Sequence, residues 1–214
     1  MTVKPALADI QLTAFMSSRI CHDLIGPVGA ISNGLELLEE ETDEDTRAYA
    51  QEVILNSAQA AWTRLEFARL AFGASSGMGQ AIDIGQAERI ARGYVEEGKH
   101  RLAWDAPDDL QLDKSYARLL MILIAIAIPA LPVGGELHVD VTNADGPPTL
   151  TIHCVGRNAR IPDKVEGILS GTDLEGIDPR SILPYYAARL ADEVDMDISV
   201  KQEGEDVVFT AAPA

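Results

Sequence analysis

The fold of this chain is decided by residues 15–38, which read FMSSRICHDLIGPVGAISNGLELL. Apolar residues recur in this stretch at alternating spacings of three and four, which is the repeat of a helix that packs along one seam. Four residues interrupt the repeat: His22, Asp23, Gly26 and Pro27. Each of them costs helix stability, so a helix that only had to bury itself would not carry them together. The stretch therefore predicts a long helix with a functional site on it.

The first third of the chain predicts two long helices and a turn. The seam of the first helix consists of Cys21, Leu24, Val28, Ile31, Leu35 and Leu38, and that of the second consists of Ile54, Ala58, Ala61, Leu65, Ala68 and Phe72. Between them lies Glu39–Asp45, an acidic polar turn in which Thr42 or Asp43 suits the N-cap of the second helix. Gly73 suits the end of that helix, so we expect an antiparallel hairpin within residues 1–73.

A single hairpin of this kind cannot cover both of its seams. Two copies packed around a two-fold axis would form a four-helix bundle that buries them, so we expect a homodimer. The alternative is that the hairpin packs on the second domain of its own chain. The regularity of the repeats favours the homodimer.

A small and flexible stretch at residues 74–80 predicts a linker to a second domain, residues 81–214. Patterning predicts strands at Ala81–Ile84, Arg101–Trp104, Glu136–Val141 and Leu150–Val155, helices at Gln86–Glu97, from Lys114 and at Arg180–Ala191, and a closing hairpin at Met196–Thr210. These elements predict a mixed sheet with helices on one face. The expected fold class is therefore α+β, a helical hairpin followed by an α/β sandwich.

Composition and charge exclude several classes of protein. The 214 residues are 47% hydrophobic, and 17 basic against 34 acidic residues give a net charge of −17, which disfavours binding to nucleic acid or anionic membrane. The longest apolar run, Leu119–Leu131, is well short of the roughly 20 residues that cross a bilayer. Two cysteines and the lack of a signal-like start favour a cytoplasmic protein with free thiols.

His22 lies one residue past the seam position Cys21, which rotates it about 100° away from the bundle core. We therefore expect its imidazole to face solvent. The same helix face carries small or polar residues that leave room for another protein: Ser18, Gly26, Gly29 and Asn33. The alternative is a solvated surface histidine without a function.

The chemistry of His22 and its neighbours favours phosphoryl transfer. An imidazole nitrogen can attack phosphorus and hold a phosphoryl group, and Asp23 can orient the ring or accept its other proton. Arg19 lies one turn earlier and adds positive charge. Pro27 lacks the N–H that would bond to the Asp23 carbonyl, so we expect the helix to bend one turn after the histidine.

These residues carry a resemblance to a known family. Phe15, the run His22-Asp23-Leu24, Pro27 and Ile31 occur in the order and spacing of a box that resembles the phosphoacceptor box of two-component histidine kinases. The second half of the chain resembles the ATP-binding domain of the same kinases, as a scaffold only. The resemblance implies that His22 is phosphorylated.

The residues with which those kinases bind nucleotide are missing. Met121 and Ala125 correspond to the two asparagines that hold the metal and phosphates, and neither can ligate magnesium. Gly156–Arg160 replaces the Asp-x-Gly-x-Gly loop, and Asp178–Arg180 replaces the glycine-rich lid. We therefore expect no ATP binding and no cofactor held by this chain.

A kinase-like hairpin joined to a nucleotide-free remnant is similar to the bacterial cytoplasmic histidine phosphotransferases of the ChpT family. The resemblance implies that His22 takes a phosphoryl group from the receiver domain of a hybrid histidine kinase and passes it to response regulators of the cell cycle, with Mg²⁺ on the receiver. It also implies that the second domain helps to grip the receiver. The expected docking residues are Phe15, Ser18, Arg19, Gly26, Gly29 and Asn33.

Two other functions stay open, an unusual ATP-dependent histidine kinase and a scaffold that binds receivers without covalent chemistry. A metal site built from His138, Asp140, His153 and Cys154 is disfavoured, because alternate strand residues face opposite sides and no paired ligand motif is present. We expect Cys21 to be a small core residue, since it belongs to the seam.

Overall fold

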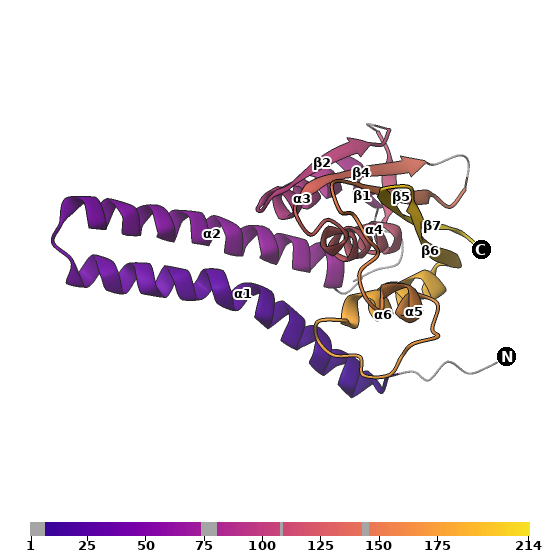
Figure 1. Cartoon of the computed structure of the whole chain (residues 1–214), viewed down its shortest axis with the longest axis horizontal. Helices are drawn as coiled ribbons and strands as arrows, with labels where there is room; N and C mark the ends of the chain where they lie inside the picture. Colours follow the sequence, from indigo (N-terminus) through magenta and orange to yellow (C-terminus); the bar gives the residue numbers. More distant parts are fainter. Residues whose placement is uncertain (1–6, 74–80, 108, 143–145) are drawn as a thin grey trace.

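The computed structural model describes residues 7–73, 81–107, 109–142 and 146–214. A long hairpin of two helices, α1 (Asp9–Glu40) and α2 (Glu44–Phe72), projects from an α/β part that the rest of the chain forms (Figure 1). The predicted helical hairpin and the α+β fold class are confirmed. The expected linker at 74–80 lies outside the described residues.

Small side chains bring the two helices of the hairpin close together. Gly34 is buried on α1, and a β-carbon at that position would lie 2.7 Å from Cγ1 of Ile54 on α2. Ala50 and Ala61 are buried on the facing side of α2. Interiors are packed at the density of organic crystals, so this close approach leaves little space between the helices.

The turn between the helices is capped by side chains. The Asp43 carboxylate accepts a hydrogen bond from the main-chain N–H of Thr46 at 2.9 Å, which makes Asp43 the N-cap of α2, as predicted. Arg47 of α2 donates to the main-chain carbonyl of Glu41 at 2.9 Å and also to the carbonyl of Leu38, so the C-terminal end of α1 is satisfied. Gly73 follows the last residue of α2, also as predicted.

The predicted seams divide into two sets in the single chain. One set is buried or half-buried: Leu24, Ile31, Leu38, Ile54, Ala61, Ala68 and Phe72. The five remaining residues are exposed: Cys21, Val28, Leu35, Ala58 and Leu65. The expectation that Cys21 is a core residue is wrong for the single chain, because the contact between α1 and α2 uses the other positions of the repeat and leaves this side of α1 outside.

The α/β part is built around a five-stranded mixed sheet. The strands are β1 (Ala81–Asp83), β2 (His100–Asp105), β3 (Gln111–Asp113), β4 (Gly135–Thr142), β5 (Thr149–Val155), β6 (Met196–Glu203) and β7 (Asp206–Pro213). The order in the main sheet is β2-β4-β5-β7-β6, with β2 parallel to β4 and the other pairs antiparallel. The strands β1 and β3 form a separate antiparallel pair.

Helices cover one face of this sheet. They are α3 (Ile84–Glu96), α4 (Lys114–Ala127) followed by the 3-10 turn η1 (Ile128–Ala130), α5 (Val165–Leu169) and α6 (Ile182–Glu193). Each strand and helix predicted for this part is present, with ends that differ by a few residues. The strand β3 and the helix α5 were not predicted, because elements of three and five residues are too short to show a period.

The hairpin and the α/β part share one hydrophobic core. The buried residues of α4 pack with Leu150, Ile152 and Phe209 of the sheet, and Phe67 and Leu70 of α2 belong to the same cluster. The first helix of the hairpin, α1, also contacts α6 of the α/β part (Figure 1). The base of the hairpin is therefore fixed to the α/β part. Among the described residues, no helix combines the length and the apolar character that a membrane span requires.

Candidate functional site

His22 lies on the outside of α1, where a partner can reach it. Its side chain is 70% exposed, so the exposure predicted from its rotation away from the seam is confirmed. The Nδ1 atom of the ring lies 3.5 Å from Oδ1 of Asp23, the next residue. A distance of 3.5 Å is at the upper limit for a hydrogen bond, so the ring is oriented only weakly by this contact.

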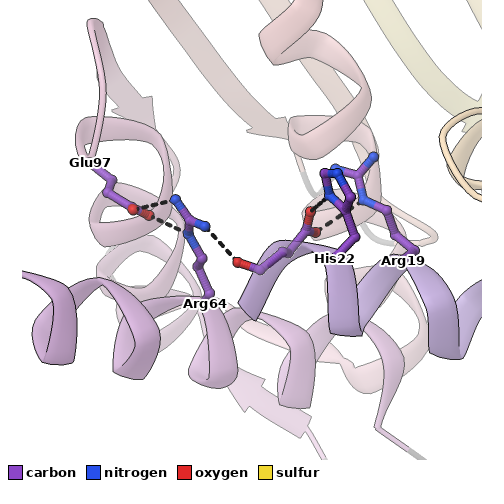
Figure 2. Close-up of polar contacts among 5 residues, drawn as sticks. Arg19, His22, Arg64 and Glu97 are labelled. Atoms are coloured by element: carbon purple, nitrogen blue, oxygen red, sulfur yellow. Dashed lines mark hydrogen bonds and ion pairs between the residues drawn. The ribbon is translucent and has the colours of Figure 1, made fainter. Parts of the chain in front are cut away.

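Asp23 is held in place mainly by Arg19. The Nε atom of Arg19 donates to Oδ2 of Asp23 at 3.0 Å, a pair spaced by four residues along α1, and both side chains are about three-quarters buried. From the sequence, Arg19 was expected to add positive charge near His22. The structure instead pairs that charge with Asp23 beside His22 (Figure 2).

Pro27 is buried within α1 and does not end the helix. Its ring nitrogen has no hydrogen, so the carbonyl of Asp23 has no donor within the helix. Arg64 of α2 takes that place, because its Nη1 atom donates to the Asp23 carbonyl oxygen at 2.5 Å. Figure 1 shows that α1 follows α2 near the turn and diverges from it toward the N-terminus, which agrees with the bend expected at the proline.

Arg64 is itself fixed by Glu97, the residue that follows α3. Its Nε donates to Oε2 of Glu97 at 3.0 Å and its Nη2 donates to Oε1 at 2.6 Å (Figure 2). The hydrogen bond to this carboxylate raises the pKa of Arg64 above its ordinary value, so the guanidinium stays charged. Neither Arg64 nor Glu97 was predicted from the sequence as part of the site. The available signal was an arginine at position 64 beside the seam residue Leu65, which alone is not specific.

The helix face around His22 is open. Ser18, Gly26 and Asn33 are exposed, and no atom lies within 4 Å of a β-carbon built at Gly26 or Gly29. These residues form the small-residue face that the sequence predicted. Two of the expected docking residues are less accessible: Arg19 is paired with Asp23, and Phe15 is half-buried and packs against the core.

Comparison with known proteins identifies the family. Residues 84–206 match the family model described as histidine phosphotransferase C-terminal domain. The chain is also 42% identical over 213 residues to the protein phosphotransferase ChpT of Brucella abortus (strain 2308), which covers 99% of this chain and 100% of that protein. The chain belongs to the histidine phosphotransferase family. A solved structure of a bacterial phosphotransferase is 40% identical, covers 99% of this chain and 100% of its own, and superposes with a TM-score of 0.88.

This histidine phosphotransferase has a pocket of about 350 Å³ between α1, α4 and the segment before α6. Ala125 and Ile126 contribute apolar surface from α4, while Asp178 and Arg180 line the pocket from the segment that replaces the kinase lid. Met121, the other residue that replaces a kinase asparagine, is fully buried in the core. The lining from α4 therefore offers no amide or carboxylate to a metal or a phosphate.

His138 of β4 lies opposite His153 of β5 in the sheet of the phosphotransferase. Among the described residues, no group of three histidine, cysteine, aspartate or glutamate side chains is placed to hold a metal ion. His138 makes a contact of 3.2 Å with Glu136 on the same strand. Burial raises the pKa of the Cys154 thiol to about 12, so this thiol is unreactive at neutral pH.

Proposed function

We propose that this histidine phosphotransferase carries a phosphoryl group on His22 from one receiver domain to another. The donor is the aspartyl phosphate of the receiver of a hybrid histidine kinase, and the acceptors are aspartates of response regulators. The observation that carries this proposal is the exposed imidazole of His22, which stands on an open face with the carboxylate of Asp23 beside it. The resemblance to ChpT extends the proposal to regulators of the cell cycle in the cytoplasm.

We infer a role for each ring nitrogen from the position of Asp23. With the ring proton on Nδ1, on the side of the Asp23 carboxylate, the lone pair of the neutral imidazole lies on Nε2. Nε2 attacks the phosphorus of the aspartyl phosphate, an N–P bond forms, and the P–O bond to the receiver breaks. The bonding electrons leave on the receiver carboxylate. In the second half-reaction an aspartate of the next receiver attacks the same phosphorus, and the electron pair returns to Nε2.

The partner supplies the remaining requirements of phosphoryl transfer. A divalent cation and positive charge are needed around the phosphoryl oxygens. Arg19 is engaged with Asp23, and Arg64 is engaged with Glu97, so neither guanidinium near His22 is left over for the phosphoryl group. We assign Mg²⁺ and the additional cation to the receiver, and no cofactor to this chain.

The same proposal excludes ATP as the source of the phosphoryl group. The pocket beside α4 is lined by Ala125, one of the two positions that correspond to the asparagine ligands of the kinases, and the other position, Met121, is buried in the core. Asp178, which lines the same pocket, accepts hydrogen bonds from the main-chain N–H groups of Arg180 and Ser181, so its carboxylate is engaged in the turn. This lining supports a phosphoryl carrier rather than an ATP-dependent kinase.

We also propose that the phosphotransferase is a homodimer through its hairpin. Large apolar side chains remain exposed along one stripe of each helix at heptad spacing: Ile25, Val28 and Leu35 on α1, and Leu55, Trp62 and Leu65 on α2. Trp62 is 60% exposed and Leu55 is 70% exposed, which is costly for residues of this size. A second hairpin packed on these stripes completes a four-helix bundle and presents two copies of His22.

The homodimer is tested by the mass of the protein in solution. Trp62→Asp puts a charge on the stripe, so we expect the mass to fall from twice that of one chain to that of one chain. Tyr49→Asp is the matched control, because Tyr49 is an exposed aromatic residue of α2 that lies off the stripe. A wild-type protein that sediments as a monomer contradicts the proposed dimer.

The proposed function is tested by following labelled phosphate. The protein incubated with ATP and Mg²⁺ should stay unlabelled, whereas a phosphorylated receiver with Mg²⁺ should label it in an acid-labile form. His22→Ala should abolish labelling, and His153→Ala should not, because His153 is exposed on β5 far along the sequence from the site. Labelling from ATP alone would instead establish a kinase, and receiver binding without labelling of the wild type would establish a scaffold.

A further inference from the structure

We propose that Arg64 and Glu97 are positioning residues for phosphoryl transfer. Arg64 holds the main-chain carbonyl of Asp23, the residue next to His22, and Glu97 holds Arg64. Neither side chain touches the reacting atoms. This inference rests on the proposed role of His22 and adds to it a dependence on the α/β part of the chain.

The need for Arg64 follows from Pro27. In a regular helix the carbonyl of Asp23 would accept the N–H of residue 27, but proline has none. A partly buried carbonyl without a donor costs free energy, and a helix relieves that cost by shifting its backbone. Arg64 reaches across from α2 and donates to this carbonyl at 2.5 Å. The backbone that carries His22 is thereby held at one position.

The charge of Arg64 is not available for a phosphoryl group. Glu97 binds the guanidinium through two parallel hydrogen bonds, of 3.0 and 2.6 Å, in the bidentate geometry that arginine and carboxylate prefer. The third contact goes to the Asp23 carbonyl. An arginine that stabilised the transferred phosphoryl group would instead direct N–H groups without another partner toward it. The role of Arg64 is therefore geometric.

Glu97 makes this geometry depend on α3. The helix is fixed to α2 close to Arg64, because Tyr94 stacks on Phe67 with ring centroids 3.8 Å apart. A β-carbon at Gly93 would lie 3.2 Å from Cγ2 of Thr63, so α3 approaches α2 closely at this point. A shift of α3 moves Glu97, which moves Arg64 and the carbonyl beside His22 (Figure 2). The α/β part thus sets the rate of transfer without contributing an atom to the reaction.

The first test separates the rate of transfer from receiver binding. Misplacing a reacting group by a fraction of an ångström slows a reaction more than it weakens binding. For Arg64→Met we expect the rate at saturating phosphorylated receiver to fall about tenfold, with an unchanged half-saturating receiver concentration. Glu97→Gln should give a smaller loss of the same kind. Arg89→Met is the control, because Arg89 is an exposed arginine of α3.

The second test asks whether Arg64 acts by replacing the donor that Pro27 lacks. Pro27→Ala restores the main-chain N–H, so the carbonyl of Asp23 regains its helical partner. In the Pro27→Ala background, Arg64→Met should then cost less than about twofold in rate. A merely structural role of Arg64 predicts the same loss in both backgrounds, and that result would overturn the inference.

A spectroscopic readout on milder, folded variants keeps the inference testable if Arg64→Met unfolds or is inactive. The carbonyl ¹³C resonance of Asp23 should shift in Arg64→Lys and Glu97→Gln, because the hydrogen bond to that oxygen is lost or weakened. An unchanged resonance would contradict the inference. Transfer that survives His22→Ala would refute the proposed function instead, and transfer that requires His22 but is equally fast in Arg64→Met would refute only the role of Arg64.

Discussion

Gly34 of α1 and Ile54 of α2 approach so closely that a β-carbon at residue 34 would lie 2.7 Å from Cγ1 of the isoleucine. Real β-carbons essentially never approach another heavy atom to less than 3.0 Å. This contact fixes the distance between α1 and α2 at a point nearer to the turn of the hairpin than His22. Two other glycines of α1, Gly26 and Gly29, have open space where a side chain would stand. Glycines of one helix therefore serve two different purposes.

We predict that Gly34→Ala destabilises the hairpin although alanine favours helices. Overpacking costs about 1–3 kcal/mol, and the gain in helix propensity is about 1 kcal/mol, so the net loss should be about 1 kcal/mol. Gly29→Ala has no such clash and should gain about 1 kcal/mol. Chemical denaturation at one protein concentration measures both changes. Equal effects of the two substitutions would show that the close approach to Ile54 is not present in solution.

The open face around Gly26 gives a second prediction. Gly26→Trp adds a large side chain at an exposed position where no atom lies within 4 Å of a β-carbon, so the fold should tolerate it while an approaching receiver is blocked. We expect transfer to fall at least tenfold through weaker receiver binding. Asn56→Trp, on an exposed position of α2 off the proposed dimer stripe, is the control for added bulk. Normal transfer by Gly26→Trp would mean that the receiver docks elsewhere on the hairpin.

Asp23→Asn separates orientation of the imidazole from docking. The substitution removes the charge that pairs with Arg19 and accepts from His22, while the size of the side chain is kept. We expect the rate of transfer to fall by about a hundredfold, the lower end of the range for a positioned general base, with receiver affinity nearly unchanged. Rapid-quench kinetics and a binding titration measure the two quantities. A large loss of affinity would show that Asp23 contacts the receiver.

The cap at Asp43 predicts how stability depends on pH. Hydrogen bonds from Thr46 hold the pKa of Asp43 below its ordinary value of 3.8. A lowered pKa in the folded state means that the contribution is present above pH 3.8 and is lost as the pH falls through the folded value. Asp43→Asn keeps a cap without a charge. The difference in melting temperature between wild type and variant should therefore shrink from about pH 7 to about pH 3, and a constant difference would contradict this.

The hairpin, its turn and the exposure of His22 could be predicted from the sequence because each depends on local signals. Heptad spacing places residues on a helix face, and Asp43 before Glu44 is a local capping signal. Within the seam of α1, Leu24 is half-buried and Cys21 is exposed, and this difference could not be predicted. The heptad pattern does not show which seam residues face the neighbouring helix of the same chain.

The contacts that position His22 and Asp23 could not be predicted from the sequence either. Arg64 and Glu97 lie 33 residues apart on either side of residues 74–80, and their pairing depends on how α3 docks against α2. The sequence shows that Pro27 lacks the N–H that would bond to the Asp23 carbonyl. Only the tertiary structure shows that Arg64 replaces it. The role expected for Arg19 changed for the same reason, since its pairing with Asp23 depends on the rotamers of both side chains.

The central claim is that His22 carries the phosphoryl group, and phosphorylation mapping of protein trapped during transfer tests it most directly. The wild type is mixed with phosphorylated receiver and Mg²⁺, quenched at alkaline pH, and digested for mass spectrometry. We predict one added phosphoryl group on the peptide that contains His22, localised to that histidine. A phosphoryl group found on another residue, or none on any peptide while the receiver loses its own, would contradict the account.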